Sequence, residues 1–248
     1  MSLKRIYRKQ PGDLDWDGAV NARHICSVFY RMGRHEWLTG QGWRQMHDAG
    51  VGKVIDLRNP EEIRRREHDP AVPEASSAGI ELVNLPLEEP GNERFDSVAV
   101  PYMNHTGMYR LVCEEFGAHL REVFEQLASA QGLVVIHCSA GRDRSGLIAT
   151  MLLGLAGLDD QILLHDELAV RGINEWHRIS PRKHPYERFL SEDELRPIIA
   201  ERAAELEKFC AWLGSARSYL LAQGMSEEAV ERLEQLARRE RGWQSESS

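Results

Sequence analysis

Short apolar runs alternate with amphipathic segments along most of the chain. Three of these runs, 53–57, 80–87 and 133–137, are rich in β-branched residues, as is typical of strands buried in a sheet. Between them, 39–49 and 109–127 repeat apolar residues at the spacing of one helical face. Strands that alternate with helices predict an α/β fold.

The pattern becomes more helical after the third run. Residues 146–156 are apolar on nearly every side, which predicts a central, buried helix that ends at Gly157. A second helix is expected to start from a cap at Asp159 and to continue through Leu168.

Capping patterns mark further helices near the C-terminus. Ser191 and Glu194 form a capping-box pattern ahead of a new apolar periodicity, and a serine cap predicts a last helix over 226–238. We therefore expect residues 191–243 to be helical, followed by a frayed tail at 244–248.

The composition is that of a globular protein, with 42% hydrophobic and 28% charged residues among 248. No Gly/Ser-rich linker or internal repeat divides the chain, so residues 1–248 are expected to form a single domain. The net charge of −8 argues against binding to nucleic acid, which requires an extended cationic surface. No stretch approaches the roughly 18 apolar residues of a membrane span, which predicts no integral membrane association.

Four cysteines lie far apart in the sequence, at Cys26, Cys113, Cys138 and Cys210. This spacing does not form a disulfide framework and is typical of a reducing compartment. A cytoplasmic location is therefore expected, although secretion and the oligomeric state both stay open.

The segment 133–146, LVVIHCSAGRDRSG, has the pattern of a strand, a tight loop and a helix. In this arrangement the loop N–H groups converge, and the helix N-terminus adds partial positive charge. A phosphate group is the expected ligand of such a loop. The residues expected to bind it are Ser139, Ala140, Gly141, Arg142, Asp143 and Arg144.

Cys138, directly after the strand, is the expected nucleophile, since the field that binds an anion also favours a thiolate. The planar guanidinium of Arg144 can bind two phosphate oxygens, which lysine cannot do. Gly141 supplies the conformational freedom that the turn needs. Ser145 can hydrogen-bond the thiolate and assist its departure, and His137 is expected to support the loop through backbone hydrogen bonds.

These residues form the H-C-x5-R-S signature of cysteine-based phosphatases. HCSAGRDRSG at 137–146 closely resembles the HCxAGKDRTG loop of the bacterial tyrosine phosphatase family, which is related to dual-specificity and phosphoinositide phosphatases. Two positions depart from that pattern, because Arg142 stands where lysine is usual and His24 where aspartate is frequent. Further segments that resemble the family are 21–23 (NAR), 28–33 (VFYRMG), 54–58 (VIDLR) with Glu61 or Glu62, and 214–224 (GSARSYLLAQG).

The resemblance implies a cysteine-phosphatase-like fold, with a central, mostly parallel sheet flanked by helices and a helical C-terminal extension. It also implies that Cys138 forms a cysteinyl-phosphate intermediate that water then hydrolyses, without a metal or other cofactor. The expected substrate is a phosphorylated protein, chiefly at tyrosine, with dual specificity as an option. A phosphoinositide is the alternative substrate, because Arg142 offers another charged contact.

The leaving oxygen needs a proton, and four carboxyl groups are candidates for the general acid. Asp143 is preferred because it lies in the loop and its counterpart has been assigned a catalytic part in the family. Against it, an aspartate at a helix start commonly acts as a cap, and cationic neighbours disfavour a proton donor. The competitors lie in the predicted long loop at 88–106 and are Glu88, Glu89 and Asp96.

Asp56 and Arg58 lie where a strand ends, which is where α/β proteins place ligands. They either support the pocket or form a buried ion pair that ties the strand to a neighbouring element. The ten histidines show no metal-binding spacing, so no metal site is expected. Two other classes of protein remain as alternatives, namely a rhodanese-like sulfurtransferase and a phosphate-binding module without catalysis.

Overall fold

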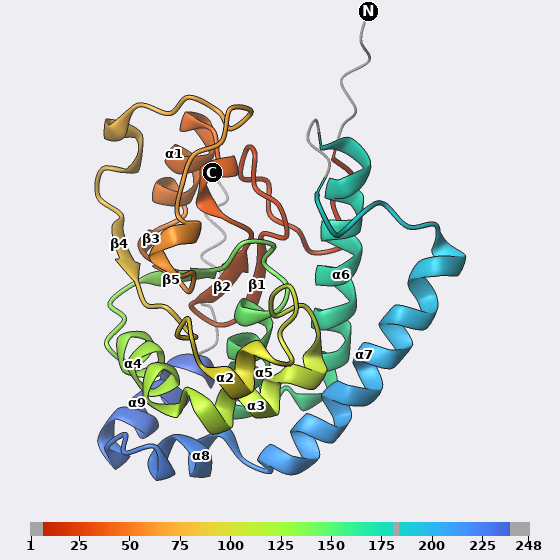
Figure 1. Cartoon of the computed structure of the whole chain (residues 1–248). Helices are drawn as coiled ribbons and strands as arrows, with labels where there is room; N and C mark the ends of the chain where they lie inside the picture. The colour runs from red at the N-terminus through yellow and green to blue at the C-terminus, as the bar shows by residue number, and fades with distance from the viewer. Residues whose placement is uncertain (1–6, 181–183, 239–248) are drawn as a thin grey trace, which may run out of the picture.

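The computed structural model describes residues 7–180 and 184–238, and a five-stranded sheet lies at its centre (Figure 1). The strand order is β1-β2-β5-β3-β4. Strands β2, β5, β3 and β4 run parallel, and β1 is antiparallel to β2. The expected α/β fold with a mostly parallel sheet is confirmed. The strands are β1 (Arg23–Cys26), β2 (Phe29–Met32), β3 (Val51–Asp56), β4 (Glu81–Asn84) and β5 (Leu133–His137).

The pattern of apolar runs did not predict β1 and β2. Each has only four residues, and polar side chains interrupt both, with Arg23 and His24 in β1 and Arg31 in β2. Ser27 joins them in a turn with a φ of 44°. Arg31 is nevertheless 1% exposed, so a buried cation stands in this strand where an apolar side chain is usual.

One face of the sheet is covered by α1 (Gly40–Asp48), which begins where the Thr39 hydroxyl accepts a hydrogen bond from Gly42 N–H (3.2 Å). Trp43 and Met46 of α1 pack against Val54 and Val135 of the sheet. The chain then leaves the helix at a glycine in the left-handed region and enters β3, as the sequence predicts.

The other face of the sheet carries the larger core, and the almost wholly buried α5 (Arg144–Ala156) lies at its centre. Gly157 ends α5 with a φ of 76°. In Figure 1 the remaining helices of this layer lie below the sheet, opposite α1. They are α3 (Tyr109–Glu115), α4 (Gly117–Ala128), α8 (Ala216–Ala222) and α9 (Glu227–Arg238).

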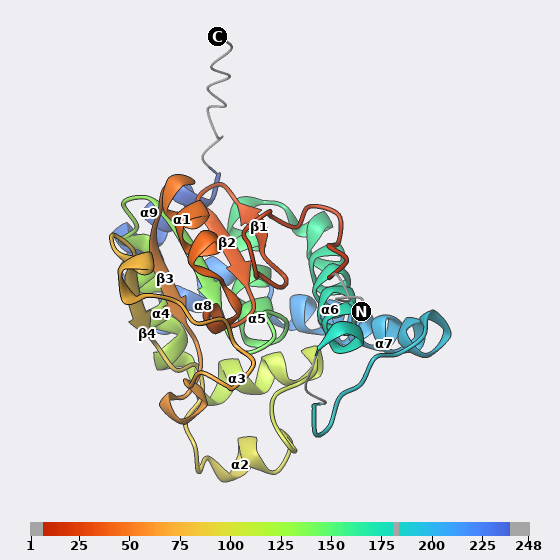
Figure 2. The same ribbon diagram turned by 90° about the horizontal axis from the view of Figure 1, so that it is seen from above.

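The prediction of one continuous helix over 109–127 is wrong. Phe116 leaves helical geometry (φ −121°, ψ 32°) and separates α3 from α4. Its ring lies edge-on to Phe95 at 5.2 Å between centroids. Phe95 belongs to the short α2 (Glu93–Asp96). This helix lies in the long loop that precedes α3, which extends away from the sheet (Figure 2).

The helix expected over 159–168 begins differently and runs further. Asp159 does not cap it but lies inside a single 3-10 turn, after which α6 (Ile162–Ile179) continues. The next helix, α7 (Glu192–Leu213), begins with the predicted capping box, in which Glu194 Oε2 accepts from Ser191 N–H and Oγ–H. The 3-10 turns are η1 (His35–Trp37), η2 (Pro60–Glu62), η3 (Glu74–Ser77), η4 (Thr106–Met108) and η5 (Asp159–Gln161).

Helical structure in the C-terminal part is confirmed as far as Arg238, where α9 ends. The Ser226 hydroxyl accepts a hydrogen bond from Ala229 N–H (3.1 Å) near the start of α9, as its predicted capping role requires. The tail predicted at 244–248 lies outside the described residues. Within the described part of the chain, no helix combines the length and the apolar character needed to cross a bilayer.

Candidate functional site

The predicted phosphate loop connects β5 to α5 at the carboxyl edge of the sheet. Cys138 follows the last residue of β5, and Ser145 lies in the first turn of α5. Their Sγ and Oγ atoms are 3.6 Å apart, within hydrogen-bonding range for sulfur. Cys138 is 3% exposed, whereas Ser139 and Ala140 are half-buried, so the loop reaches the surface at these two residues.

The backbone N–H groups of the loop donate no hydrogen bond to the described part of the chain. Within the described residues, no oxygen accepts a hydrogen bond from the N–H groups of Ser139 to Arg144. Buried N–H groups are rarely left without an acceptor. Six consecutive donors beside a cysteine and a helix N-terminus form an environment suited to an anion.

Gly141 is required by the geometry of the loop on two counts. Its φ of 66° lies in the left-handed region, which favours glycine. A Cβ at this position would also stand 2.5 Å from the backbone of Met32 and Gly33. The loop therefore packs against the end of β2 too closely for any side chain.

Arg144, the first residue of α5, is held by two carboxylates. Glu62 of η2 binds it through both oxygens, at 2.5 and 2.8 Å, and also accepts a hydrogen bond from Ser139 Oγ (3.2 Å). Glu88 Oε1 lies 3.5 Å from Arg144 Nη1. Burial opposes the charged form of Arg144, but Glu62 and Glu88 raise its pKa overall.

Glu88 differs from the other carboxylates of this edge. It is buried, and its Oε2 atom has no hydrogen-bond partner within the described residues. Burial raises the pKa of Glu88, and the nearby Glu62 carboxylate adds to that effect, against the influence of Arg144. Such surroundings favour the protonated form of this carboxyl group over the charged form.

The other two carboxylates of the predicted loop lie elsewhere. Glu89 is exposed and pairs with His119 of α4 at 3.1 Å. Asp96 is exposed and accepts a hydrogen bond from Gly91 N–H. Neither lies within 4.0 Å of Arg144.

Asp143 is enclosed by arginines. Its oxygens bind Arg142 Nε (2.9 Å) and Arg202 Nη1 of α7 (3.0 Å). Arg202 also binds Asp166 of α6 through two hydrogen bonds, at 2.6 and 2.9 Å. Burial raises the pKa of Asp143, but the two arginines outweigh it and hold the pKa below its usual value.

Arg142 is also fully engaged. Glu187 binds both of its terminal nitrogens, at 3.0 and 3.1 Å. The same carboxylate accepts a hydrogen bond from Tyr102 Oη (2.6 Å) and contacts His177 Nε2 (3.1 Å). Arg142 therefore points into a network of protein groups on one side of the loop.

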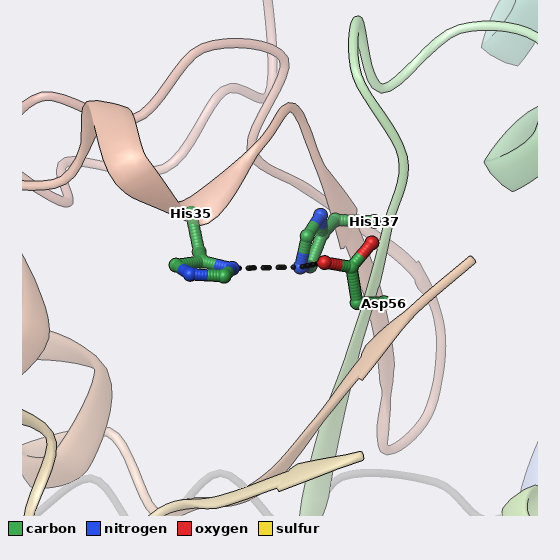
Figure 3. Close-up of side chains that lie close together, drawn as sticks. All are labelled: His35, Asp56 and His137. Carbon is green, nitrogen blue, oxygen red and sulfur yellow. Dashed lines mark hydrogen bonds and ion pairs between the residues drawn. The ribbon is translucent and has the colours of Figure 1, made fainter. Parts of the chain in front are cut away.

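His137, the last residue of β5, lies beside His35 and Asp56 (Figure 3) and contacts the start of the loop. Its Nδ1 lies 3.2 Å from Cys138 O, and because a carbonyl only accepts, Nδ1 carries the proton. Nε2 then accepts from His35 Nδ1, which lies 3.1 Å away. Burial lowers the pKa of His137 to about 4, so the ring is neutral at neutral pH.

Asp56 lies beside His35 and His137, and each of the three side chains has an atom that could bind a metal ion. The donor atoms of His35, Asp56 and His137 lie within 4.8 Å of one another. However, Asp56 already accepts three side-chain hydrogen bonds from Arg58, at 2.7 to 3.2 Å, which places a cation beside the cluster. Arg58 also binds Glu36 of η1 (3.1 Å), so it ties β3 to a neighbouring element.

Sequence reasoning assigned no role to several residues that support this site. Glu62 and the 21–33 segment appeared only as parts of a family pattern, and His35, Glu187 and Arg202 did not appear at all. Their partners lie far away along the chain, so no local spacing marks them. Arg31 of the VFYRMG segment could have drawn attention in the sequence, because a charged side chain in a buried strand is costly unless it has partners.

Comparisons with known proteins agree with this geometry. A family model described as the tyrosine phosphatase family matches residues 17–237. A tyrosine-protein phosphatase from Nostoc commune is 28% identical over 123 residues, which cover 46% of this chain and 42% of that protein. The chain thus matches less than half the length of this curated relative.

Two solved structures are also similar. TpbA of P. aeruginosa has 16% identity and a TM-score of 0.32, and the match covers 90% of this chain and 99% of that one. The core catalytic domain of the PP-IP phosphatase SIW14 from S. cerevisiae, in complex with citrate, has 14% identity and a TM-score of 0.35. That match covers 78% of this chain and 93% of the other.

Proposed function

The chain belongs to the tyrosine phosphatase family, whose model matches residues 17–237, and on that premise we propose that it hydrolyses phosphotyrosine esters through a cysteinyl-phosphate intermediate. One observation carries the proposal. The Cys138 sulfur, the Ser145 hydroxyl and six N–H groups without an acceptor in the described chain belong to one short loop that ends at Arg144 and the start of α5. This combination supplies a nucleophile, a thiolate-stabilising group and donors for phosphate oxygens.

In the first step the Cys138 thiolate attacks phosphorus in line with the leaving oxygen. The S–P bond forms as the P–O bond to the substrate breaks, and the leaving phenolate takes a proton from Glu88. Loop N–H groups and Arg144 bind the three remaining phosphate oxygens, and they act by positioning and by charge stabilisation.

We assign the proton to Glu88 rather than to Asp143, which the sequence favoured. Two arginines hold the pKa of Asp143 low and occupy its oxygens, so it is a poor donor. Glu88 has a raised pKa, a buried Oε2 without a partner among the described residues, and a position 3.5 Å from Arg144. These are the properties expected of a general acid.

In the second step water hydrolyses the intermediate. Glu88, now ionised, accepts a proton from the attacking water, and the S–P bond breaks to release inorganic phosphate. The hydroxyl of Ser145 donates to the departing sulfur, which restores the thiolate without a metal or other cofactor. A proton returned to Glu88 is then available for the next substrate.

The surroundings of Arg142 favour a phosphotyrosine substrate over a phosphoinositide. Glu187 and Asp143 bind this guanidinium through all three of its nitrogens and offset its charge, so it attracts an additional phosphate group only weakly. We expect kcat/KM to be highest for a phosphotyrosine peptide, lower for the matched phosphoserine and phosphothreonine peptides, and lowest for a phosphoinositide. A higher value for the phosphoinositide would identify a lipid phosphatase instead.

The decisive experiment compares the wild type with Cys138→Ser. The wild type should hydrolyse 4-nitrophenyl phosphate and be inhibited by vanadate, and the variant should be inactive with unchanged circular dichroism and unfolding temperature. Turnover that survives the substitution would disprove the mechanism. Phosphopeptide binding by the wild type without release of phosphate would identify a binding module.

A further inference from the structure

We infer that Arg31 is a positioning residue for the phosphate loop. Its guanidinium holds the loop through two carbonyl oxygens and places a positive charge near Cys138. The inference rests on the proposed function and deepens it. Arg31 lies in β2, outside the loop motif, and its side chain is buried. Its partners show what the side chain does there.

The loop carbonyls are all turned away from the anion site. Cys138 O accepts from His137 Nδ1, and Ser139 O accepts from the backbone N–H of Arg34. A peptide group that turns its carbonyl outward presents the opposite side, where the next N–H lies, to the inside. Fixing the carbonyls therefore fixes the direction of the donors.

Side chains hold the next three carbonyls. Asn21 Nδ2 donates to Ala140 O (2.9 Å) and also to Ala169 O of α6 (2.9 Å). Arg31 Nη2 then donates to both Gly141 O and Arg142 O, at 2.9 Å each. One guanidinium nitrogen thus orients two consecutive peptide groups in the tightest part of the turn.

The charge of Arg31 has no direct ion-pair partner. Within the described residues no carboxylate lies within 4.0 Å of its guanidinium, and its Nε atom has no hydrogen-bond acceptor. A guanidinium stays protonated even when buried. An unpaired buried cation is costly, so an anion nearby is expected to offset that cost.

The surrounding ionisable groups leave the loop as the natural site for that anion. Asp143 and Asp166 are the nearby carboxylates, and Arg202 binds both. Tyr109 of α3 and His165 of α6 face Arg31 as well, but burial keeps both neutral, and Arg23 of β1 is itself a cation. Cys138 also acts on the charge of Arg31, and it becomes negative when its thiol ionises.

Arg31 therefore has two separable effects. Its two hydrogen bonds, both donated by Nη2, orient the loop donors and depend on the reach and the rigid plane of the guanidinium. Its charge favours the thiolate of Cys138, which needs only a cation at that place. Lysine preserves the charge on a shorter, flexible side chain, and methionine preserves neither the charge nor the two hydrogen bonds.

The test compares Arg31→Lys and Arg31→Met with the wild type in two assays. The first measures kcat/KM for 4-nitrophenyl phosphate. The second follows the rate of Cys138 alkylation by iodoacetamide against pH, with the modified cysteine identified by mass spectrometry. Burial raises the pKa of Cys26 and Cys113 to about 12, so these thiols react slowly.

We expect both variants to lose roughly 10- to 100-fold in kcat/KM, as is usual when a group that orients an active site is removed. The alkylation midpoint should rise by about one pH unit in Arg31→Met and change little in Arg31→Lys. Leu233→Ala is the control, because truncation of this buried leucine of α9 should lower the stability of the protein without changing a residue of the loop. It should leave the midpoint unchanged.

An unshifted midpoint in Arg31→Met, with a loss of turnover no greater than in Leu233→Ala, would overturn the inference. So would full activity in Arg31→Lys, because the reach and rigid plane of the guanidinium would then be dispensable. The alkylation assay does not depend on phosphate release. An inactive wild-type protein with a normal Arg31 effect on alkylation would refute the proposed function alone.

Discussion

Glu62 binds the Arg144 guanidinium through both carboxylate oxygens, at 2.5 and 2.8 Å. Such a two-point contact fixes the guanidinium plane as well as its position. Glu62 itself is anchored, because its Oε2 accepts from the backbone N–H of Asn59 (3.1 Å). The guanidinium that we propose to bind phosphate is thus oriented by a residue that the loop itself does not contain.

Glu62→Gln is expected to lower kcat/KM about tenfold, since a neutral amide holds Arg144 less firmly. Steady-state kinetics with 4-nitrophenyl phosphate and the affinity for vanadate would both report the loss. Glu61→Gln is the matched control, because the neighbouring Glu61 is exposed. Equal kinetics for the two variants would show that Glu62 has no such role.

Glu88→Gln should lose the basic limb of the pH profile and roughly 10² to 10⁴ in kcat, because the leaving oxygen then lacks its proton donor. Substrates with acidic phenols should be affected least, since their leaving groups need no proton. Asp143→Asn is the comparison, and it should keep the basic limb whatever its activity. Loss of that limb in Asp143→Asn, with its retention in Glu88→Gln, would reverse the assignment.

Gly141→Ala should destabilise the protein by about 2 to 4 kcal/mol and abolish most activity, because the Cβ meets the Met32 carbonyl and the backbone is in the left-handed region. Gly157→Ala separates the two causes. Gly157 is also in the left-handed region (φ 76°, ψ 30°), but no atom of the described chain lies within 4 Å of its Cβ position. Its cost in urea unfolding should be only about 1 kcal/mol. Equal costs would exclude the close approach to β2.

Arg202→Met should destabilise the protein by about 3 to 5 kcal/mol at pH 7, because two buried carboxylates lose their shared partner. The folded-state pKa of Asp143 is held low, so its stabilising effect is present above the unfolded value of about 3.9 and is lost as pH falls. The difference in unfolding free energy between the variant and the wild type should therefore be largest above about pH 5 and shrink as the pH falls from about 4 towards 2. Urea unfolding at several pH values measures it.

Arg110→Met is a suitable control for that experiment, because the Arg110–Glu114 pair lies on the surface of α3. It should change stability little at any of these pH values. A pH-independent penalty in Arg202→Met would mean that packing, rather than charge, accounts for the loss.

The sequence by itself determined the elements whose signals are local. Residues 133–137 form a strand because β-branched side chains suit a buried sheet, and α5 is buried because its apolar residues face every direction. The capping box of Ser191 with Glu194 formed as predicted because both partners lie within one helical turn. The loop motif from 137 to 146 likewise contains its nucleophile and its guanidinium in one short segment.

Only the tertiary structure decided which charges meet around that loop. Glu62, Arg31 and Arg202 come from η2, β2 and α7, and Glu88 comes from the segment after β4. No spacing along the chain connects these residues. Their pKa values depend on burial and on neighbours that packing brings together. For this reason the sequence favours Asp143 as the general acid, whereas the surroundings in the folded protein favour Glu88. A sequence motif can predict which residues react, whereas the tertiary structure determines the electrostatic field that acts on them.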